Sequence, residues 1–378
     1  MPQPRLLLVV NTDWFFLSHR LAVAVGARQA GYDVHLACGN TGRLAEIEAH
    51  GIVVHELPIS RRGMSVLEQI GTVRAMAALM RALRPDIVHL VTIKPVLLGG
   101  LAARLARVRA VVAAISGMGY VFIARGAVAR LRRALVSLLY RAALGRRNVT
   151  VIVQNPDDAA LVTRLAGLAP SRIERIRGSG VDLAACAPAP LPDGEPVVVF
   201  AARLLGDKGL REFVAAARML KADGIRARFV VAGDPDLDNP ASVLPAEIEA
   251  WRREGVADFV GFQADVPGLF AAAHLVVLPS YREGLPKVLL EAAACGRAVV
   301  TTDVPGCRDA VEAGRTALLV PAMEAKPLAA AIRRLVEDRA LCAGMGEEGR
   351  RLAEAEFSIG RVVEAHLAIY ARVLEETA

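Results

Sequence analysis

The feature that most constrains the fold is a regular series of short apolar segments, rich in branched residues, that runs through the chain and restarts in its second half. The segments alternate with longer Ala- and Arg-rich stretches whose apolar residues have helical spacing. Continuous apolar runs of this length are typical of strands buried in a parallel sheet, with helices as connections. The alternation of strand-like and helical segments therefore predicts βαβ units on parallel sheets. The expected strands are 6–10, 33–37, 53–56, 87–91, 111–115 and 150–154, and then 197–200, 228–232, 259–261, 275–279, 298–301 and 317–320.

Residues 184–196 separate the two runs of segments and contain four prolines without any periodicity. Such a stretch is typical of a linker. A chain of 378 residues is long enough for two domains with substantial cores. We therefore expect an α/β protein with two Rossmann-like parallel-sheet domains that are joined once and face each other across a cleft.

Composition places the chain among folded proteins of a reducing compartment. It is 54% hydrophobic and only 4% aromatic, which excludes a disordered chain. The five cysteines are odd in number and form no C-x-x-C, so we expect neither a disulfide framework nor a zinc cluster. The apolar run at residues 6–10 is too short for a signal peptide, and no run reaches the roughly 18 apolar residues of a spanning helix. We expect a cytoplasmic location.

The positive charge is confined to the first half of the chain. Residues 1–188 hold 24 Lys and Arg against 11 Asp and Glu, whereas residues 189–378 hold 22 against 28. Nucleic acid would explain a basic half, but aromatic residues are sparse and no helix-turn-helix, RNP or zinc-finger pattern is present. An anionic membrane surface or a lipid diphosphate explains the charge better, so we expect no nucleic-acid partner.

The segment R-E-G-L-P-K-V-L-L-E at 282–291 carries two carboxylates at a loop and a helix. It follows the apolar segment 274–279, so Glu283 is expected at the carboxyl end of a strand, where open α/β sheets bind ligands. Pro286 fits a first helical position, which places Glu291 about two turns along the helix. Free N–H groups at a helix start suit a diphosphate, and a carboxylate on each side of it suits sugar hydroxyls.

Two cations are expected at the same edge of that sheet. Arg203 and Lys208 follow the strand at 197–200, just before a helix that begins near Leu210. Arginine offers a planar fork and lysine a compact point charge to diphosphate oxygens. Both residues are therefore candidate ligands for the same diphosphate.

Several motifs resemble those of a known family. R-L-L-G-D-K-G at 203–209, E-G-L-P-K-V-L-L-E at 283–291 and T-T-D-V-P-G-C at 301–307 resemble the donor half of retaining glycosyltransferases of family 4, which have the GT-B fold. N-T-D-W-F-F-L-S-H-R at 11–20, T-I-K-P at 92–95 and S-G-M-G-Y at 116–120 resemble the branch that extends lipid-linked oligosaccharides. The resemblance implies an acceptor-binding domain at 1–185, a nucleotide-sugar-binding domain at 186–358 and a helix at 359–378 that crosses back to the first domain.

The resemblance also implies an activity. It is the metal-independent transfer, with retention and without a cofactor, of a hexose or N-acetylhexosamine from a UDP-sugar to a polyprenyl-diphosphate-linked saccharide. Arg203 and Lys208 would stabilise the departing diphosphate, Glu283 would bind the donor sugar, and Glu291 would bind the ribose. The remaining donor-binding positions implied by the resemblance are Gly117, Gly284, Leu285 and Pro286.

The acceptor side is expected in the first domain. Lys94 follows the strand at 87–91, which suits a lipid diphosphate, and the resemblance adds Gly117, Met118 and Tyr120. Many family 4 members have a histidine where this chain reads S-G-M-G at 116–119, so only backbone groups are available there. Asp13 and His19 are the remaining candidates for a catalytic group, although a histidine at that place commonly packs on or caps a helix.

The segment 120–147 contains seven arginines, no carboxylate and several interleaved leucines. This pattern favours an interfacial helix that binds an anionic membrane through Arg130, Arg132 and Arg133; a core helix with a basic rim is the alternative. The Asp-rich stretch at 234–238 lacks the glycine and the final Glu of a calcium loop, so we expect a surface loop and no metal. Two other functions stay open: a nucleotide-sugar epimerase on the same fold, and a basic scaffold for membranes or nucleic acid.

Overall fold

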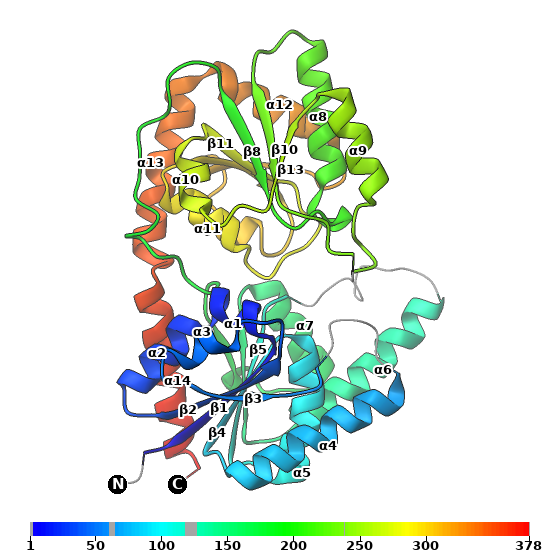
Figure 1. Ribbon diagram of the computed structural model, residues 1–378, viewed down its shortest axis with the longest axis vertical. Helices are drawn as coiled ribbons and strands as arrows, with labels where there is room; N and C mark the ends of the chain where they lie inside the picture. The colour runs from blue at the N-terminus through cyan, green and yellow to red at the C-terminus, as the bar shows by residue number, and fades with distance from the viewer. Residues whose placement is uncertain (1–2, 60–64, 118–126, 238, 378) are drawn as a thin grey trace. The chain divides into compact units, whose positions relative to one another are not determined.

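The computed structural model describes residues 3–59, 65–117, 127–237 and 239–377, without the side chains of 127–133 and 135. The chain divides into two compact units (Figure 1). Unit 1 comprises Met1–Ser179 and Ile359–Ala378, and unit 2 comprises Gly180–Ser358. Within the described residues, no helix combines the length and apolarity needed to cross a membrane.

Unit 1 is built on a parallel sheet with the strand order β3-β2-β1-β4-β5-β6-β7. Its strands are β1 (Arg5–Thr12), β2 (Asp33–Gly39), β3 (Val53–Glu56), β4 (Ile87–Val91), β5 (Ala110–Ile115), β6 (Val149–Val153) and β7 (Ile173–Arg175). Its α-helices are α1 (Asp13–His19), α2 (Leu21–Gln29), α3 (Leu44–Glu48), α4 (Val66–Leu83), α5 (Gly100–Ala106), α6 (Ala127–Leu144), α7 (Pro156–Ala166) and α14 (Ile359–Glu375). A π-helix, η1 (Pro95–Gly99), leads into α5, and the 3₁₀ turn η3 (Pro170–Arg172) precedes β7.

Both faces of this sheet are buried, which explains the continuous apolar pattern of its strands. Along β1, Leu7 and Val9 belong to a core that also includes residues of α4, η1, α5, α6 and α7. The alternate residues Leu6 and Leu8 belong to a second core with α1, α2 and α14. The last helix of the chain, α14, therefore packs in unit 1, beside α2 (Figure 1).

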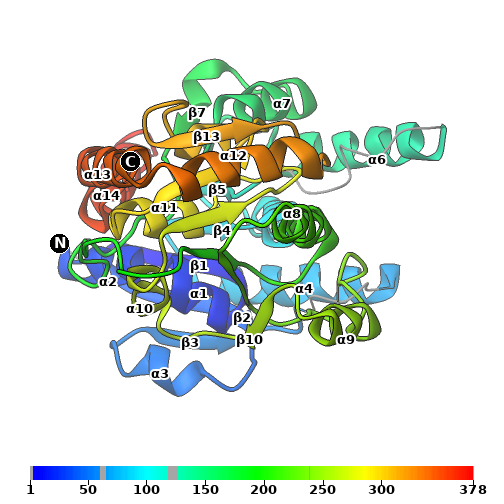
Figure 2. The ribbon, with the colours of Figure 1, turned by 90° about the horizontal axis from the view of Figure 1, so that it is seen from above.

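Unit 2 is built on a parallel sheet with the strand order β10-β9-β8-β11-β12-β13. Its strands are β8 (Val197–Ala201), β9 (Arg228–Ala232), β10 (Asp258–Gly261), β11 (Leu275–Leu278), β12 (Ala298–Thr302) and β13 (Ala317–Val320). Its α-helices are α8 (Leu210–Ala222), α9 (Pro245–Glu254), α10 (Val266–Ala271), α11 (Lys287–Ala294), α12 (Ala325–Glu337) and α13 (Arg339–Glu356). The 3₁₀ turns are η4 (Gly206–Lys208) and η5 (Arg308–Ala310), and α8 packs beside α12 and α11 beside α13 (Figure 2).

The predicted α/β architecture with two parallel sheets is confirmed, and each expected segment forms a strand. Strand β7 was not predicted because its three residues, I-E-R, carry no apolar run. The start of α11 also differs from the prediction. Pro286 is the N-cap residue of α11 and precedes its first turn, so Glu291 lies about one turn along the helix instead of two.

The proline-rich stretch predicted as a linker packs within unit 2, because three arginine side chains bind its carbonyl groups. Arg297 is fully buried and donates to the carbonyl oxygens of Ala189 at 2.7 Å and Pro190 at 3.3 Å. Arg350 donates to the carbonyl oxygen of Cys186 at 2.7 Å, and Arg339 donates to a carbonyl further along the stretch. Unit 1 accordingly ends at Ser179 and not at the expected residue 185.

Each sheet has one place where the strand order reverses. In unit 1 it lies between β1 and β4, and in unit 2 between β8 and β11. The loops that follow such a pair of strands run in opposite directions and leave a crevice at the carboxyl ends, where open α/β sheets bind ligands. The motifs at 11–20, 92–95, 203–209 and 283–291 all follow one of these four strands.

A buried polar cluster lies between β4 and α14 in unit 1. The His89 Nδ1 is 2.6 Å from the Tyr370 hydroxyl, and the ring of His366 lies 5.5 Å from the ring of His89. Arg20, which is only 3% exposed, belongs to the same cluster. Burial and the Arg20 charge lower the pKa of His366 to about 3, and burial, His366 and Arg20 lower the pKa of His89 well below its usual value.

This cluster predicts that stability falls in mild acid. Both histidines are neutral in the folded protein but titrate near their ordinary pKa of about 6.5 once unfolded. The unfolded chain therefore binds more protons below pH 6.5, and the stability present above that pH is lost as the pH falls toward 3. Each histidine contributes at most about 1.4 kcal/mol per pH unit.

Thermal unfolding between pH 7.5 and 4.5 measures this effect. His366→Gln should unfold at a lower temperature at pH 7.5 but lose less stability on acidification than the unchanged protein. The exposed His50 provides the matched control, since His50→Gln should leave the acid slope unaltered. Equal slopes for all three proteins would contradict the prediction.

Candidate functional site

In unit 2 the two motifs predicted to share a sheet edge are joined by an ion pair. The Lys208 Nζ, at the end of η4, contacts the Glu283 Oε1 in the loop after β11. The same carboxylate oxygen accepts a hydrogen bond of 2.7 Å from the hydroxyl of the buried Ser280. The side chains of Lys208 and Glu283 are only 19% and 12% exposed, so solvent screens this pair weakly.

A close backbone approach brings η4 to the end of β11. Gly209 has a φ of 76°, and a Cβ atom there would overlap the carbonyl group of Pro279, directly after β11. Only glycine fits both conditions, since it has no Cβ and reaches positive φ without a steric penalty. The backbone N–H of Tyr281 also donates to the Asp207 carbonyl oxygen at 2.9 Å. The position of Lys208 against Glu283 is therefore fixed by the backbone.

The loop that carries Glu283 is held from its other side by the segment after β12. The Glu283 backbone N–H donates to the Pro305 carbonyl oxygen at 3.0 Å, and a Cβ at Gly306 would overlap the Glu283 carbonyl group. The Thr302 hydroxyl donates to the Ser280 carbonyl oxygen. The T-T-D-V-P-G-C motif thus supports the Glu283 loop.

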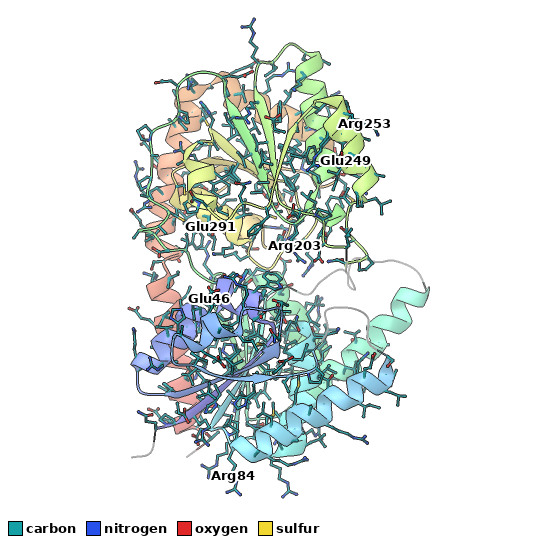
Figure 3. The ribbon with its side chains drawn as sticks, in the orientation of Figure 1. Glu46, Arg84, Arg203, Glu249, Arg253 and Glu291 are labelled. Atoms are coloured by element: carbon teal, nitrogen blue, oxygen red, sulfur yellow. The ribbon has the colours of Figure 1, made fainter. Side chains whose placement is uncertain are left out.

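Arg203 and Glu291 lie at the same end of unit 2 (Figure 3). The Arg203 guanidinium is 44% exposed and donates to the Asp236 carboxylate at 2.7 Å. Glu291 pairs with Lys287, one turn earlier in α11, at 3.0 Å. The structure therefore joins Lys208 to Glu283, whereas Arg203 and Glu291 each have a different partner. Gly284, Leu285 and Pro286 are buried between the Glu283 loop and α11.

Sequence reasoning missed Ser280 and Asp236 as parts of this site. Ser280 directly follows the segment predicted as a strand, which was a usable signal, because residues at a strand's carboxyl end face the crevice. Asp236 was assigned to a surface loop, but its side chain is only 13% exposed and binds Arg203. No cluster of three or more potential metal ligands occurs among the residues that the structure describes.

In unit 1, Asp13 follows β1 and is fully buried. It accepts hydrogen bonds from the backbone N–H groups of Thr41 at 2.7 Å, Arg43 at 2.9 Å and Trp14 at 2.7 Å, and from the Thr41 hydroxyl. Burial alone would raise its pKa, but these hydrogen bonds lower the pKa below its usual value. Asp13 is thus a weak base, and its hydrogen bonds hold the loop after β2 in place.

His19 ends α1 and is stacked on Phe15, with ring centroids 4.3 Å apart. Its Nδ1 lies 2.6 Å from the Ser18 hydroxyl. These contacts agree with the alternative in which this histidine packs on its own helix. Gly117 follows β5 with a φ of 106°, whereas Met118 and Tyr120 lie outside the described residues, as do the side chains of Arg130, Arg132 and Arg133.

The carboxyl ends of β1 and β4 hold polar atoms that the sequence did not single out. The Asn11 Oδ1, the Thr12 Oγ1 and the Thr92 Oγ1 are buried without a hydrogen-bond partner among the residues that the structure describes. Thr92 also has a φ of 74°, which is costly for a β-branched residue. Unsatisfied polar atoms and backbone strain of this kind concentrate at functional sites. Lys94 lies two residues further, and burial lowers its pKa.

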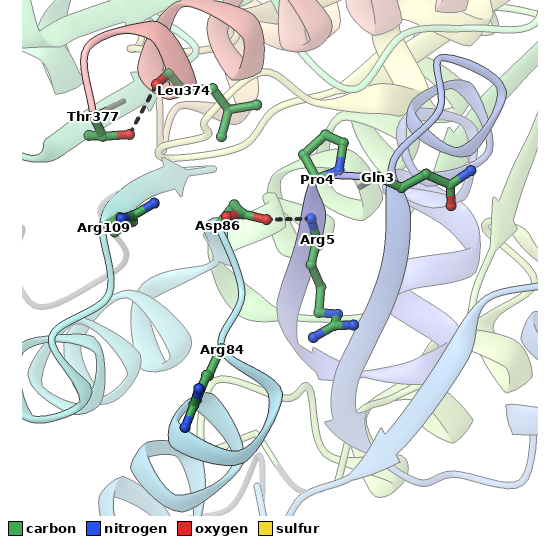
Figure 4. Close-up of a pocket in the computed structure, with 8 residues that line it drawn as sticks. All are labelled: Gln3, Pro4, Arg5, Arg84, Asp86, Arg109, Leu374 and Thr377. Carbon is green, nitrogen blue, oxygen red and sulfur yellow. Dashed lines mark hydrogen bonds between the residues drawn. The ribbon is translucent and has the colours of Figure 1, made fainter. Parts of the chain in front are cut away.

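A cavity of about 410 Å³ at the other end of the unit 1 sheet is a weaker candidate. It adjoins Arg5, which begins β1, and Asp86, which precedes β4 (Figure 4). The Asp86 carboxylate accepts the Arg5 backbone N–H at 2.8 Å, and the Arg5 guanidinium pairs with Asp33 at 2.9 Å. These charges hold strand ends together at the amino side of the sheet.

Comparison with known families agrees with the placement of the motifs. Residues 187–352 match the family model described as glycosyl transferases group 1, and residues 5–155 match the model described as glycosyl transferase 4-like. The chain is a glycosyltransferase of family 4. The two models correspond to the two sheets, and the first of them includes Arg203, Lys208, Glu283 and Glu291.

Two relatives that this glycosyltransferase resembles over most of its length come from bacteria. It is 28% identical over 86% of both chains to the N,N'-diacetylbacillosaminyl-diphospho-undecaprenol alpha-1,3-N-acetylgalactosaminyltransferase of Campylobacter jejuni. It is 26% identical to the putative glycosyltransferase EpsD of Bacillus subtilis, over 98% of this chain and 97% of that one.

Solved structures show the fold of this glycosyltransferase. Sucrose-phosphate synthase from Thermosynechococcus elongatus matches with a TM-score of 0.82 and 21% identity over 99% of this chain and all of that one. Anabaena Alr3699/HepE, in a complex with UDP and glucose, matches with a TM-score of 0.76 and 18% identity over 98% of this chain and all of that one. The expected GT-B fold is thereby confirmed.

The close approach at Gly209 predicts a specific sensitivity of the site. Gly209→Ala should lower the free energy of unfolding by several kcal/mol, because the new methyl group meets the Pro279 carbonyl and displaces η4 with Lys208. Gly224 is a matched control, since it has a φ of 77° and nothing within 4 Å of its Cβ position. Gly224→Ala should cost only the roughly 1 kcal/mol of the left-handed backbone. Denaturant unfolding compares the two, and equal losses would contradict the steric argument.

Proposed function

We propose that this glycosyltransferase moves a hexose or N-acetylhexosamine from a UDP-sugar to a polyprenyl-diphosphate-linked saccharide, with retention of the anomeric configuration and without a metal ion. The observation that carries the proposal is the cluster of Lys208, Ser280 and Glu283 at the strand-order reversal of unit 2. The C. jejuni relative is named for a diphospho-undecaprenol acceptor, which supports the lipid diphosphate, and the UDP and glucose of the HepE complex support the donor.

Donor binding follows from the charges of unit 2. In this structure Lys208 pairs with Glu283 and Arg203 pairs with Asp236. A bound diphosphate would offer both cations a doubly charged partner that replaces these two carboxylates. Lys208 would turn from Glu283 to a phosphate oxygen, which leaves the Glu283 carboxylate ready to accept hydrogen bonds from sugar hydroxyls. Backbone N–H groups at the start of α11 add partial positive charge. Glu291 would then bind the ribose.

This arrangement also supplies the stabilisation that the reaction needs. The bond from the anomeric carbon to the diphosphate breaks, its electron pair stays on the diphosphate, and a bond to the acceptor oxygen forms. Preorganised cations next to the developing charge lower that barrier. Retention brings the acceptor hydroxyl to the face from which the diphosphate departs, so a diphosphate oxygen can take the hydroxyl proton. The low pKa of Asp13 agrees with a mechanism without a protein base at that position.

The acceptor and the membrane are assigned to unit 1. Asn11, Thr12 and Thr92 offer acceptor hydroxyl groups buried oxygens to which no described residue is hydrogen-bonded, and Lys94 offers a cation to the lipid diphosphate. Residues 101–150 contain ten arginines and no carboxylate. Each basic residue near an anionic surface contributes roughly 1 kcal/mol, so helix α6 with Arg130, Arg132 and Arg133 would hold the enzyme at the cytoplasmic face of the membrane. The enzyme would therefore be peripheral.

Product analysis tests the function. Purified protein is given a panel of UDP-sugars and a polyprenyl-diphosphate saccharide in anionic or neutral vesicles, and products are identified by mass spectrometry and by the anomeric configuration of the new bond. Transfer should persist with a chelator at millimolar concentration and should be faster with anionic vesicles. Lys208→Met should lower turnover about 100-fold or more.

Arg218 is the control for Lys208, because it also pairs with a glutamate of unit 2 but lies on α8, outside the site. Arg218→Met should leave turnover nearly unchanged. Interconversion of the UDP-sugar without an acceptor would indicate an epimerase, and absence of UDP-sugar binding would indicate a scaffold. Loss of transfer with the chelator, restored by magnesium or manganese, would refute metal independence.

The two carboxylates should separate in binding experiments. Glu291→Gln should weaken the affinity for UDP, because Glu291 is assigned to the ribose. Glu283→Gln should slow transfer while the affinity for UDP stays the same or rises, since Lys208 loses its competing partner. Calorimetry with UDP on both variants measures the difference, and equal losses would mean that the two roles are wrongly assigned.

A further inference from the structure

Unit 1 has an apolar groove whose apolar lining has no role in the function proposed above. Its volume is about 520 Å³, and helices α4, η1, α5 and α6 contribute to its walls. Its lining is aliphatic apart from a few polar side chains. The apolar lining residues are Val66, Ile70, Val73, Ile93, Leu97, Leu98, Leu101, Leu105 and Leu139.

The exposed apolar side chains on this groove are not explained by the core of unit 1. Val66 is 72% exposed, Leu105 is 56% exposed and Ile70 is 42% exposed. Leu98, in contrast, is 9% exposed and belongs to the core beneath. Single exposed apolar residues are normal, but a contiguous apolar hollow rimmed by polar residues marks a binding site.

The charged residues on the groove all have the same sign. Arg74, Lys94 and Arg104 line it, and no carboxylate is present among its described lining residues. A helix surface with no ligand usually mixes both signs, because opposite charges stabilise each other along a helix. The groove therefore suits a molecule with a long apolar part and an anionic head.

The position of the groove tells which end receives the head. Lys94 lies just after β4, at the strand-order reversal of unit 1, next to the strained Thr92. From Lys94 the wall continues through η1 and α5 to Leu105, a distance of about 16 Å at a helical rise of roughly 1.5 Å per residue. The π-helix η1 is itself a type of segment that occurs frequently at functional sites.

We propose that this groove binds the first isoprene units of the polyprenyl chain, with Lys94 at the diphosphate to which that chain is attached. The inference rests on the proposed function and extends it, because it assigns recognition of the lipid chain itself to α4, η1 and α5. The chain leaves the diphosphate along the groove, and the saccharide on the other side of the diphosphate reaches Asn11, Thr12 and Thr92.

If α4 instead inserted into a membrane, lipid binding would depend on different residues of this helix. Leu67 is 81% exposed on α4, beside Val66, but does not line the groove. A bulk lipid surface would bind Leu67 at least as well as Ile70, whereas a chain in the groove contacts only Ile70. A second copy of the protein is the other possible occupant, and it would change the oligomeric state instead.

The experiment compares acceptors that carry the same saccharide diphosphate on a methyl group, on a farnesyl chain and on an undecaprenyl chain. The unchanged enzyme should have a KM for the farnesyl acceptor at least about tenfold below that for the methyl acceptor, which corresponds to burial of about two methylene groups. Ile70→Glu with Leu105→Glu, at exposed positions that tolerate charge, should remove this difference while transfer to the methyl acceptor is unchanged. Val73→Phe, which narrows the groove, should act in the same direction. Leu67→Glu is the matched control and should leave all three KM values as they are.

Binding of farnesyl diphosphate, measured by calorimetry against inorganic diphosphate, gives a second readout that needs no turnover. The groove variants should bind both compounds equally, whereas the unchanged enzyme should prefer farnesyl diphosphate.

Equal KM values for methyl and farnesyl acceptors in the unchanged enzyme would overturn the inference and leave the proposed function intact. A loss in Leu67→Glu equal to that of the groove variants would assign the surface to the membrane, and dissociation of an oligomer in those variants would assign it to a second copy. Absence of transfer to every acceptor would refute the proposed function itself.

Discussion

The donor half of this enzyme depends on one close contact, the approach of the turn at Gly209 to the end of β11. Without a Cβ, Gly209 lets η4 lie against the Pro279 carbonyl, and this places the Lys208 ammonium on the Glu283 carboxylate. The Ser280 hydroxyl then holds the carboxylate, and the segment after β12 holds the backbone of Glu283. The backbone thus sets the cation and the carboxylate in place before any ligand arrives, and this preorganisation is what stabilisation of a departing diphosphate requires.

We expect the ion pair itself to add little to stability. A half-buried pair loses much of its solvation on folding, and its attraction roughly offsets that cost. A ligand that replaces one member therefore removes little stability, provided that it brings its own charge. The buried Arg297 and the half-buried Arg350 serve a different purpose, because both bind backbone carbonyls of the proline-rich stretch.

The sheets and the shared edge could be predicted from the sequence, because continuous apolar runs and charged residues directly after them are local patterns. Strand β7 and the N-cap position of Pro286 could not, because a short polar strand and a difference of one residue at a helix start leave no such pattern. The pairing of Arg203 with Asp236 and the strain at Thr92 depend on contacts between distant loops. Gly209 belongs to the motif R-L-L-G-D-K-G, but only the position of Pro279 explains why a glycine is needed there.

The two units use the same strand-order reversal for opposite chemistry. In unit 2, Lys208, Arg203 and Lys287 near the reversal each have a carboxylate partner that an anionic ligand can replace. In unit 1 the reversal holds neutral oxygens to which no described residue is hydrogen-bonded, the Asp13 carboxylate, which backbone N–H groups bind, and the nearby cation Lys94. Neutral oxygens can distinguish acceptors by the positions of their hydroxyl groups, and no charge has to be desolvated for this. The ion pairs of unit 2, in contrast, can exchange a carboxylate for a diphosphate. A family that keeps the fold can therefore change its acceptor by altering the residues after β1 and β4 while the donor machinery after β8 and β11 stays the same.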